Sequence, residues 1–413
     1  MLRLFNTDGR RIETFRPVDK EVVTIFTCGP SVYQRAHIGN MRTFLFEDVL
    51  VRYLEYRGYT VKRGMIITDI EDKALREAEK EGTTVKRLTD RNIGQFLKET
   101  DALGMKRPDY LPRASEHVAQ AVAIIQELLK RKVAYRHNGS VYFDPMRFKG
   151  FGKLYGLDMS TWPKKRRRFH LDTYPGVQWN RGDFILWHGC PGGDDGCWES
   201  SIGRGRPSWN VQDASTLLEY FEGTLSIYCG GIDNLYRHHD YSIAILESVR
   251  PYPMARYWLH AYHLYVGGHK MSKSRGNIIY TDMLLKGGNS YGNVRFYLID
   301  GHYRDVLNFR ENRFEQSARR LAMIKGLVRP YIKRAGNADP AGCASAARIA
   351  KAFVTSMDDD LQVAKAVDAV YAVLKGTESS ALSEGQAAAV VDELRKIDSV
   401  LRVLFNSRGT INK

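Results

Sequence analysis

The sequence predicts an α/β protein built on a Rossmann-like, doubly wound parallel sheet, with a bundle of α-helices at its C-terminal end. The first observation is a β-branched and aromatic run at residues 22–27, which is typical of a buried strand and is ended by Gly29 and Pro30. The second is that apolar residues then recur at helical spacing over residues 38–53, before a further strand candidate at 61–67. These elements form a βαβ unit, and its first turn lies at the carboxyl end of a parallel strand, where open α/β sheets bind ligands.

Helices and strands alternate along the chain to about residue 300, and only helices are expected from residue 310 onward. We expect helices at residues 74–103, 117–133, 214–221, 239–249 and 294–299, strands at 225–229 and 257–265, and breaks in the final helices near 335–341 and 376–385. The loop-rich stretch 136–208, with a basic run at 164–168, interrupts the sheet. The predicted units are therefore two halves of a sheet domain (1–135 and 209–309), an insertion (136–208) and a helical bundle (310–413).

Composition narrows the class of protein. The net charge of +15 and the isoelectric point near 9.5 favour a polyanionic partner, with nucleic acid preferred over a merely basic soluble enzyme. Five unevenly spaced cysteines do not suggest a disulfide framework, and we expect Cys190 and Cys197 to be free thiols. The N-terminus lacks an apolar signal segment and no apolar run is long enough to span a bilayer, which favours a monomeric protein of the reducing cytoplasm with no membrane partner.

Two distant segments carry phosphate chemistry. His37 and Asn40 flank the start of the helix at residues 38–53, where free N–H groups and the helix dipole favour an anion. Far downstream, Lys270 and Lys273 lie in a glycine-flanked loop at residues 267–277. Such a loop can close on an oligophosphate and release it, so we expect the two segments to meet around one nucleoside triphosphate.

These segments resemble the HIGH and KMSKS signatures of class I aminoacyl-tRNA synthetases: one reads His37-Ile-Gly-Asn40 and the other Lys270-Met-Ser-Lys-Ser274. The stretches at residues 27–33 (TCGPSVY) and 67–73 (ITDIEDK) are similar to the cysteinyl-tRNA synthetase branch. Further matches to that branch lie at residues 183–187, 205–209, 230–233 and 238–239, and Met357-Asp-Asp-Asp-Leu361 is similar to a signature of its helical bundle. The same branch includes ligases that join cysteine to an amino sugar in mycothiol synthesis.

The resemblance implies a class I synthetase fold and ATP-dependent activation of an amino acid, with Mg²⁺ on the phosphates. His37 and Asn40 would donate to phosphate oxygens, and Lys270 and Lys273 would neutralise the leaving pyrophosphate. The residues that it places around ATP are Gly29, Gly39, Gly230, Gly231, Asp233, Met271, Ser272 and Ser274. Asn40 replaces the second histidine of the family motif, and its amide remains a donor.

In the family, a zinc ion held by two Cys, one His and one Glu selects cysteine. Cys28 and His238 match the first Cys and the His, but Asp213 stands for the second Cys and Ser242 for the Glu. Zinc could still be bound by Cys28, Asp213 and His238. A carboxylate in place of a thiolate weakens thiol selectivity, so a metal-free pocket for another amino acid stays open. By resemblance, Thr68 and Trp209 also line this pocket.

The acceptor is less well defined by the sequence. About 140 residues follow the lysine loop, which suffices for the helical bundle but not for the anticodon-reading module of the family. We expect transfer to a tRNA 3′ end along the basic bundle, in which residues 310–334 carry many Arg and Lys. The alternatives are a standalone ligase acting on a small-molecule amine and an inactive RNA-binding paralogue.

Overall fold

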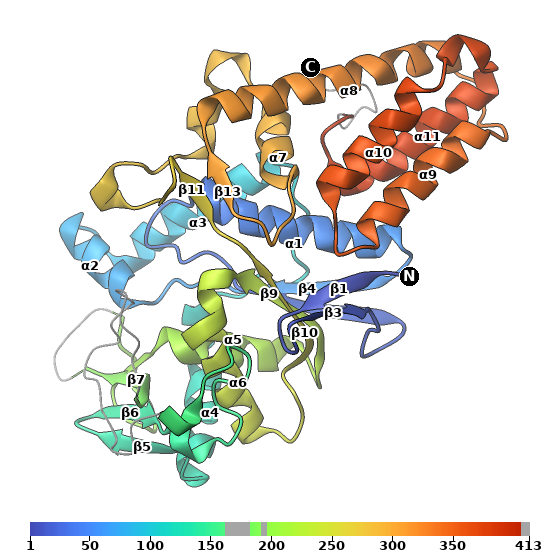
Figure 1. Cartoon of the computed structure of the whole chain (residues 1–413). Helices are drawn as coiled ribbons and strands as arrows, with labels where there is room; N and C mark the ends of the chain where they lie inside the picture. The colour runs from blue at the N-terminus through green and yellow to red at the C-terminus, as the bar shows by residue number, and fades with distance from the viewer. Residues whose placement is uncertain (162–181, 191–195, 406–413) are drawn as a thin grey trace.

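The structure is a computed structural model that describes residues 1–161, 182–190 and 196–405. Its centre is a four-stranded sheet in the order β10-β9-β3-β4, in which all neighbouring strands are parallel (Figure 1). The strands are β3 (Val22–Thr27), β4 (Thr60–Met65), β9 (Leu225–Gly231) and β10 (Ala255–Ala261). The parallel sheet expected from the sequence is therefore confirmed, with β3 and β9 joining its two halves.

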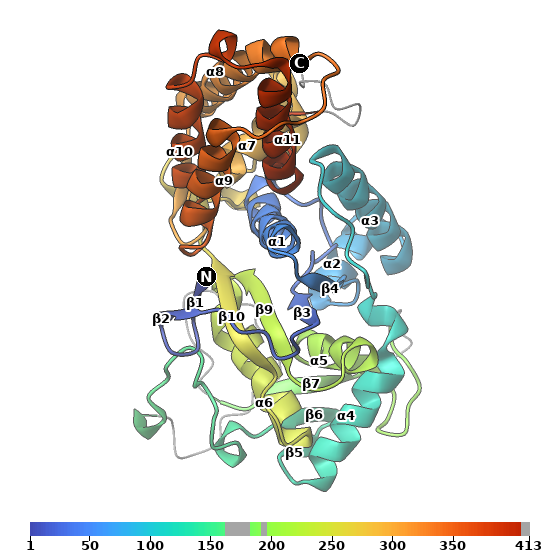
Figure 2. The same cartoon turned by 90° about the vertical axis from the view of Figure 1, so that its right-hand side faces the viewer.

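Helices cover both faces of this sheet (Figure 2). One face carries α1 (Ile38–Tyr56), and the other carries α4 (Val118–Lys130), α5 (Trp209–Tyr220) and α6 (Asp240–Val249). Side chains of a strand alternate between faces, so Val23 and Ile25 belong to the apolar cluster under α1, whereas Phe26 belongs to the opposite cluster. This two-sided burial is the doubly wound arrangement. Helices α2 (Asp72–Lys80) and α3 (Val85–Ala102) follow β4.

The insertion is a small antiparallel sheet rather than mainly loop. Its order is β5-β6-β7-β8, with β5 (Ala134–His137), β6 (Ser140–Phe143), β7 (Phe184–Gly189) and β8 (Gly205–Pro207). These strands are three to six residues long, too short for their alternation to stand out in the sequence. The basic run at 164–168 lies outside the described residues.

The expectation that Cys190 and Cys197 are free thiols is wrong, because the two form a disulfide with their Cα atoms 6.5 Å apart. Pairing of β7 with β8 brings them together: Cys190 N–H donates to Arg204 O, and Trp198 bridges to Gly205. The seven-residue spacing alone carries no signal for this bond.

The remaining elements differ from expectation mainly at their ends. Helix α5 begins at Trp209, five residues earlier than predicted, and the strand expected at 257–265 is divided into β10 and β11. Past it lie β11 (Leu264–Val266), β12 (His269–Lys270), α7 (Tyr291–Ile299) and β13 (Leu307–Phe309), and at the N-terminus β1 (Arg3–Asn6) pairs with β2 (Arg11–Thr14).

The C-terminal region is helical, as expected. It consists of α8 (Glu311–Ala335), α9 (Ala344–Met357), α10 (Val363–Lys375) and α11 (Glu384–Leu401). The break between α9 and α10 was not predicted, and it arises where Asp360 and Leu361 adopt positive φ values of 60° and 57°. None of the helices in the described ranges combines the length and the apolar character that crossing a bilayer requires.

Candidate functional site

The site lies where the two halves of the parallel sheet meet. Cys28 directly follows β3 and Gly230 and Gly231 end β9, so these segments lie side by side, with Cys28 N–H donating to Cys229 O at 3.2 Å. Strand order reverses between β3 and β9, and such a switch point opens a crevice at the carboxyl ends of the strands. The backbone here is tightly packed, because a Cβ on Gly29 would lie 1.6 Å from the Ile66 carbonyl oxygen. Any side chain at position 29 would displace β4 from this edge.

His37 is the N-cap of α1, and its capping contacts fix the direction of its ring. Nδ1 accepts the N–H groups of Gly39 and Asn40 at 3.1 and 3.3 Å, while Asn40 Oδ1 accepts the His37 N–H at 3.0 Å. Burial lowers the pKa of His37, so the ring is neutral near pH 7. With Nδ1 accepting, the proton resides on Nε2. The same ring therefore caps the helix through Nδ1 and presents Nε2–H as a donor.

The two predicted phosphate segments meet, as expected from the sequence. Met271 packs over Gly39 so closely that a Cβ on Gly39 would lie 2.8 Å from Met271 Cε. Ile38 N–H donates to Ile279 O at 3.0 Å, which joins the start of α1 to the chain just past the lysine loop. More than two hundred residues of sequence separate these contacts.

Both loop lysines face carboxylates. Lys270 Nζ lies 3.2 Å from Asp233, which follows β9, and Lys273 Nζ lies 3.1 Å from Glu77 on α2. All four side chains are partly exposed, so these ion pairs are weak and easily exchanged for phosphate. Ser272 and Ser274 hydrogen-bond to each other at 3.2 Å within the loop. Glu77 belongs to no recognisable motif, so its place at the site could not be predicted.

A second, buried group lies deeper in the crevice. Asp213 Oδ2 accepts from the Tyr228 hydroxyl, from His238 Nε2 at 3.0 Å and from the Cys28 thiol at 3.5 Å. Burial, followed by the Asp213 charge, raises the pKa of Cys28 well above its usual value, so the sulfur is a thiol in this arrangement. Cys28, Asp213 and His238, which the sequence proposed as metal ligands, are therefore in contact.

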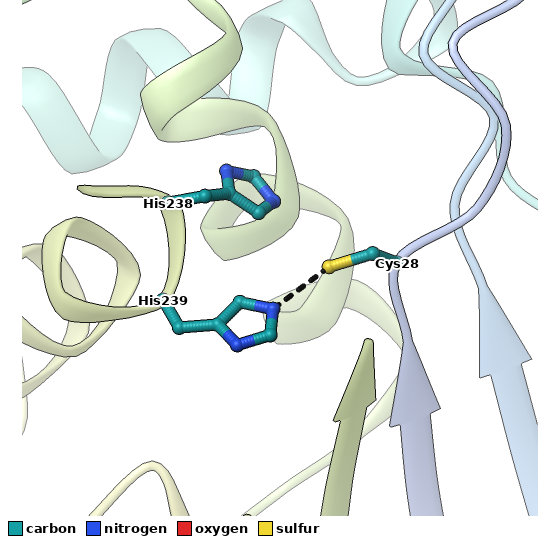
Figure 3. Close-up of side chains that lie close together, drawn as sticks. All are labelled: Cys28, His238 and His239. Carbon is teal, nitrogen blue, oxygen red and sulfur yellow. Dashed lines mark hydrogen bonds between the residues drawn. The ribbon is translucent and has the colours of Figure 1, made fainter. Parts of the chain in front are cut away.

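His239 joins this group, although the sequence assigned it no role. Its Nε2 lies 3.0 Å from Cys28 Sγ (Figure 3). The ligand atoms of Cys28, His238 and His239 all lie within 4.8 Å of one another, a grouping that could bind a metal ion. Ser242, in contrast, turns away, since its hydroxyl donates to the His238 carbonyl at 2.8 Å. The adjacent His238-His239 pair was the available signal, but sequence spacing could not show which ring turns inward.

Trp209 connects the buried group to a cavity. Its indole stacks on the His238 ring with centroids 4.6 Å apart. It also lines a cavity with ≈ 260 Å³ of empty space, bounded otherwise by Glu71, Asp72, His188, Arg206, Pro207 and Ser208. On the cavity wall, the Arg206 guanidinium donates to Asp72 Oδ1 at 2.6 Å and to Cys190 Sγ at 3.6 Å. Thr68 lies at the neighbouring edge, where its N–H donates to Pro30 O.

Comparison with known proteins places this site in a family. The profile described as "tRNA synthetases class I (C) catalytic domain" matches residues 14–319. The cysteine–tRNA ligase of Chlamydia muridarum is 36% identical over 99% of this chain and 89% of that protein. The cysteine–tRNA ligase of Koribacter versatilis is 33% identical over 98% of this chain and 82% of that protein.

Solved structures show the same fold at low identity. The Mycobacterium tuberculosis methionyl-tRNA synthetase in complex with methionyl-adenylate superposes with a TM-score of 0.67 at 14% identity and covers 92% of both chains. The LeuRS–tRNA–LeuAMS complex of Agrobacterium radiobacter K84 gives a TM-score of 0.69 at 12% identity, over 94% of this chain and 85% of that one. These similarities concern the fold alone.

Proposed function

The chain belongs to the cysteinyl-tRNA synthetase family of class I aminoacyl-tRNA synthetases, and from this premise we propose that it activates an amino acid with ATP at the β3–β9 crevice and transfers it to a tRNA 3′ end. The observation that carries the proposal is the meeting of the two phosphate segments through Met271 and Gly39. That contact brings the His37 ring and the lysine loop to one crevice.

Activation is an in-line attack of the amino-acid carboxylate on the α-phosphate of ATP, with pyrophosphate as the leaving group. The protein contributes mainly orientation and charge stabilisation. His37 Nε2–H would donate to a phosphate oxygen, since Nδ1 is occupied by the helix cap. Lys270 and Lys273 would exchange Asp233 and Glu77 for the pyrophosphate oxygens. Mg²⁺, bound together with ATP, supplies further charge neutralisation at the phosphates.

Release of Lys270 would have a second use. Asp233 lies just past β9, and its carboxylate would accept hydrogen bonds from ribose hydroxyls, as a carboxylate does in dinucleotide-binding folds. Once Lys270 moves to phosphate, the Asp233 carboxylate is available to the ribose of ATP. The same ion pair would thus prepare two contacts with one nucleotide.

We expect amino-acid-dependent exchange of labelled pyrophosphate into ATP when each amino acid is tested in turn. The matched variant is His37→Asn, because asparagine is a strong N-cap residue whose shorter side chain does not extend its amide donor to the position of His37 Nε2. Exchange should fall by about 10²–10³-fold, the cost of one transition-state donor, while thermal unfolding stays close to that of the unaltered chain. Absence of exchange with every amino acid would refute activation, and normal exchange in His37→Asn would refute the role of His37.

The basic residues of α8 do not form one continuous stripe. Arg320 pairs with Asp300 and Asp368, Arg319 pairs with Glu315, and Lys325 is buried. Apart from Arg334, whose Nε donates to the Leu382 carbonyl at 2.9 Å, the exposed cations for which the described residues contain no ion pair lie at the two ends of the helix: Arg310, Arg313, Arg329 and Lys333. At 100° per residue, the two end pairs point to different sides of the helix. A tRNA would therefore contact one end rather than the whole length.

The end at Arg310 and Arg313 is the better candidate for RNA binding. Arg310 directly follows β13, which pairs with β11, and β11 in turn pairs with β12, which contains Lys270. This end of α8 is therefore the one joined to the lysine loop, and we expect a 3′ end directed to that loop to contact it. Arg329 and Lys333 lie five to six helical turns away.

We expect tRNA binding whose logarithmic affinity falls linearly with the logarithm of salt concentration. Each phosphate contact contributes about 0.9 to the slope, so Arg310→Gln/Arg313→Gln should reduce the slope by roughly 1–2, measured by titration between 50 and 200 mM salt. Arg329→Gln/Lys333→Gln is the matched control and should leave the slope unchanged. Salt-independent or absent tRNA binding in an exchange-active enzyme would instead favour a small-molecule amine as acceptor.

A further inference from the structure

The buried carboxylate of Asp213 is already saturated by donors. A carboxylate oxygen offers about two lone-pair directions, yet Oδ2 receives the Tyr228 hydroxyl, His238 Nε2 and the Cys28 thiol. The residue is 1% exposed, and Tyr228 and Cys28 are also buried. An ion bound to this oxygen would have to displace at least one of these protons. The arrangement is therefore complete without a metal.

Distances within the group agree with this reading. A tetrahedral zinc ion with ligands at about 2.0–2.3 Å keeps its ligand atoms roughly 3.3–3.6 Å apart. His238 Nε2 and Asp213 Oδ2 are 3.0 Å apart, as are His239 Nε2 and Cys28 Sγ. Both distances are shorter than that spacing, so in this arrangement each pair is joined by a direct hydrogen bond rather than arranged around an ion. The fourth family ligand position also fails, because the Ser242 hydroxyl donates to a main-chain carbonyl.

A hydrogen-bonded chain continues behind the thiol. Thr7 Oγ1 lies 2.8 Å from His260 Nδ1, and His260 Nε2 lies 2.8 Å from His239 Nδ1. With the Cys28 thiol donating to Asp213, one direction satisfies every link: the Thr7 hydroxyl donates to His260, His260 to His239, and His239 to the sulfur. In this direction each of the two rings, His260 and His239, carries one proton and is neutral. The chain thereby fixes the position of the Cys28 sulfur through His239.

One polar atom of the group remains for a ligand. His238 Nδ1 is buried and has no hydrogen-bond partner in the described part of the chain. Since Nε2 is already used by the Asp213 carboxylate, Nδ1 is the ring atom that can bond to a ligand, and a buried polar atom left without a partner costs free energy. The His238 side chain is 9% exposed and is stacked by Trp209, which also lines the adjoining cavity. A side-chain thiol or hydroxyl of a substrate that reaches the ring beside Trp209 would supply the missing partner.

Resting on the proposed function, we propose that this pocket selects a small amino acid whose side chain ends in a thiol or hydroxyl donor, through the hydrogen bonds around Asp213 and His238 and without a bound metal ion. A thiolate–metal bond distinguishes sulfur from oxygen because zinc prefers the softer ligand. A ring nitrogen such as His238 Nδ1 forms a hydrogen bond with either group. The enzyme should therefore reject side chains that lack a donor, but should separate cysteine from serine only weakly.

The test combines metal content with pyrophosphate exchange on the full chain. We expect less than 0.1 zinc per chain by elemental analysis after purification in zinc-containing buffer, and exchange that a chelator does not change. The kcat/KM values for cysteine and serine should agree within about tenfold, and those for alanine and 2-aminobutyrate should be about 10- to 100-fold lower because Nδ1 stays unpaired. One zinc per chain, or a cysteine preference that disappears with the chelator, would overturn the proposal.

Asp213→Cys/Ser242→Glu is the matched variant, because it rebuilds a set of two Cys, one His and one Glu. This variant should bind one zinc per chain and prefer cysteine over serine by more than 10²-fold. If it does not bind zinc, the residues at positions 213 and 242 are not what excludes the metal, which contradicts the proposal. If this variant does not fold, zinc content and the cysteine-to-serine ratio of the unaltered enzyme decide. Absence of exchange with every amino acid overturns the proposed function and the substrate claim together, whereas stoichiometric zinc in an exchange-active enzyme overturns this inference alone.

Discussion

Lys273→Ala is expected to lower the rate of amino-acid-dependent pyrophosphate exchange by about 10²–10³-fold, equivalent to roughly 2.7–4 kcal/mol of transition-state stabilisation. The ammonium group lies in the exposed, glycine-flanked lysine loop, from which it would neutralise charge on the leaving pyrophosphate. Its ground-state partner Glu77 is exchangeable, since the two side chains are 50% and 22% exposed. The effect should therefore appear in kcat, measured at saturating ATP and amino acid.

The fold should not change in this variant. Loss of an exposed ion pair costs about 0.2–1 kcal/mol, so the unfolding midpoint should move little. Lys286→Ala is the matched control. Lys286 is also an exposed lysine, it lies in the segment that follows the lysine loop, and the described residues contain no ion pair for it. Near-normal exchange in Lys273→Ala, or an equal loss in Lys286→Ala, would remove Lys273 from the proposed chemistry.

Asp360→Ala is expected to lower the free energy of unfolding by about 3–5 kcal/mol, the cost of removing one partner of a buried charged pair. Asp360 lies between α9 and α10 and accepts from Phe5 N–H at 2.8 Å, the Tyr303 hydroxyl at 2.7 Å and Arg304 Nε at 2.8 Å. These donors come from β1 and from the segment before β13, so one carboxylate joins the bundle to the sheet domain. Denaturant unfolding with a linear extrapolation measures the loss.

Asp359 provides an internal control for this result. It is adjacent in sequence, but it is 49% exposed and pairs only with Arg3, which is itself 54% exposed. Asp359→Ala should cost less than about 1 kcal/mol. Equal effects of the two substitutions would show that the charge of the segment, and not the buried contacts of Asp360, stabilises the bundle.

The same carboxylate gives a pH signature. Burial raises the pKa of Asp360, but hydrogen bonds from His302, Phe5 and Tyr303 together with the charge of Arg304 outweigh it, so the pKa lies below its usual value near 3.8. A lowered folded-state pKa means that this stabilisation is present above the unfolded pKa and is lost as pH falls through the folded one. The stability difference between Asp360→Asn and the unaltered chain should therefore be constant from pH 5 to 7 and shrink below pH 4. A difference that grows on acidification would contradict this.

Local sequence patterns were sufficient for the central sheet and for the two phosphate segments. The run at residues 22–27, its ending at Gly29 and Pro30, and the helical spacing after it depend on neighbours in the chain, which is why β3 and α1 could be predicted. The lysine loop could be paired with His37 because both motifs resemble one family, and the contact of Met271 with Gly39 confirms that they meet.

The tertiary structure decided what depends on residues distant in the chain. The Cys190–Cys197 bond needs the β7–β8 pairing, and the group around Asp213 brings together positions 7, 28, 213, 228, 238, 239 and 260 from six separate elements and loops. Periodicity tells which side chains are buried, but it does not tell which ring nitrogen faces which oxygen. Whether Asp213 serves a metal or a proton is set by distances of a few tenths of an ångström, and only packing of the whole chain fixes these.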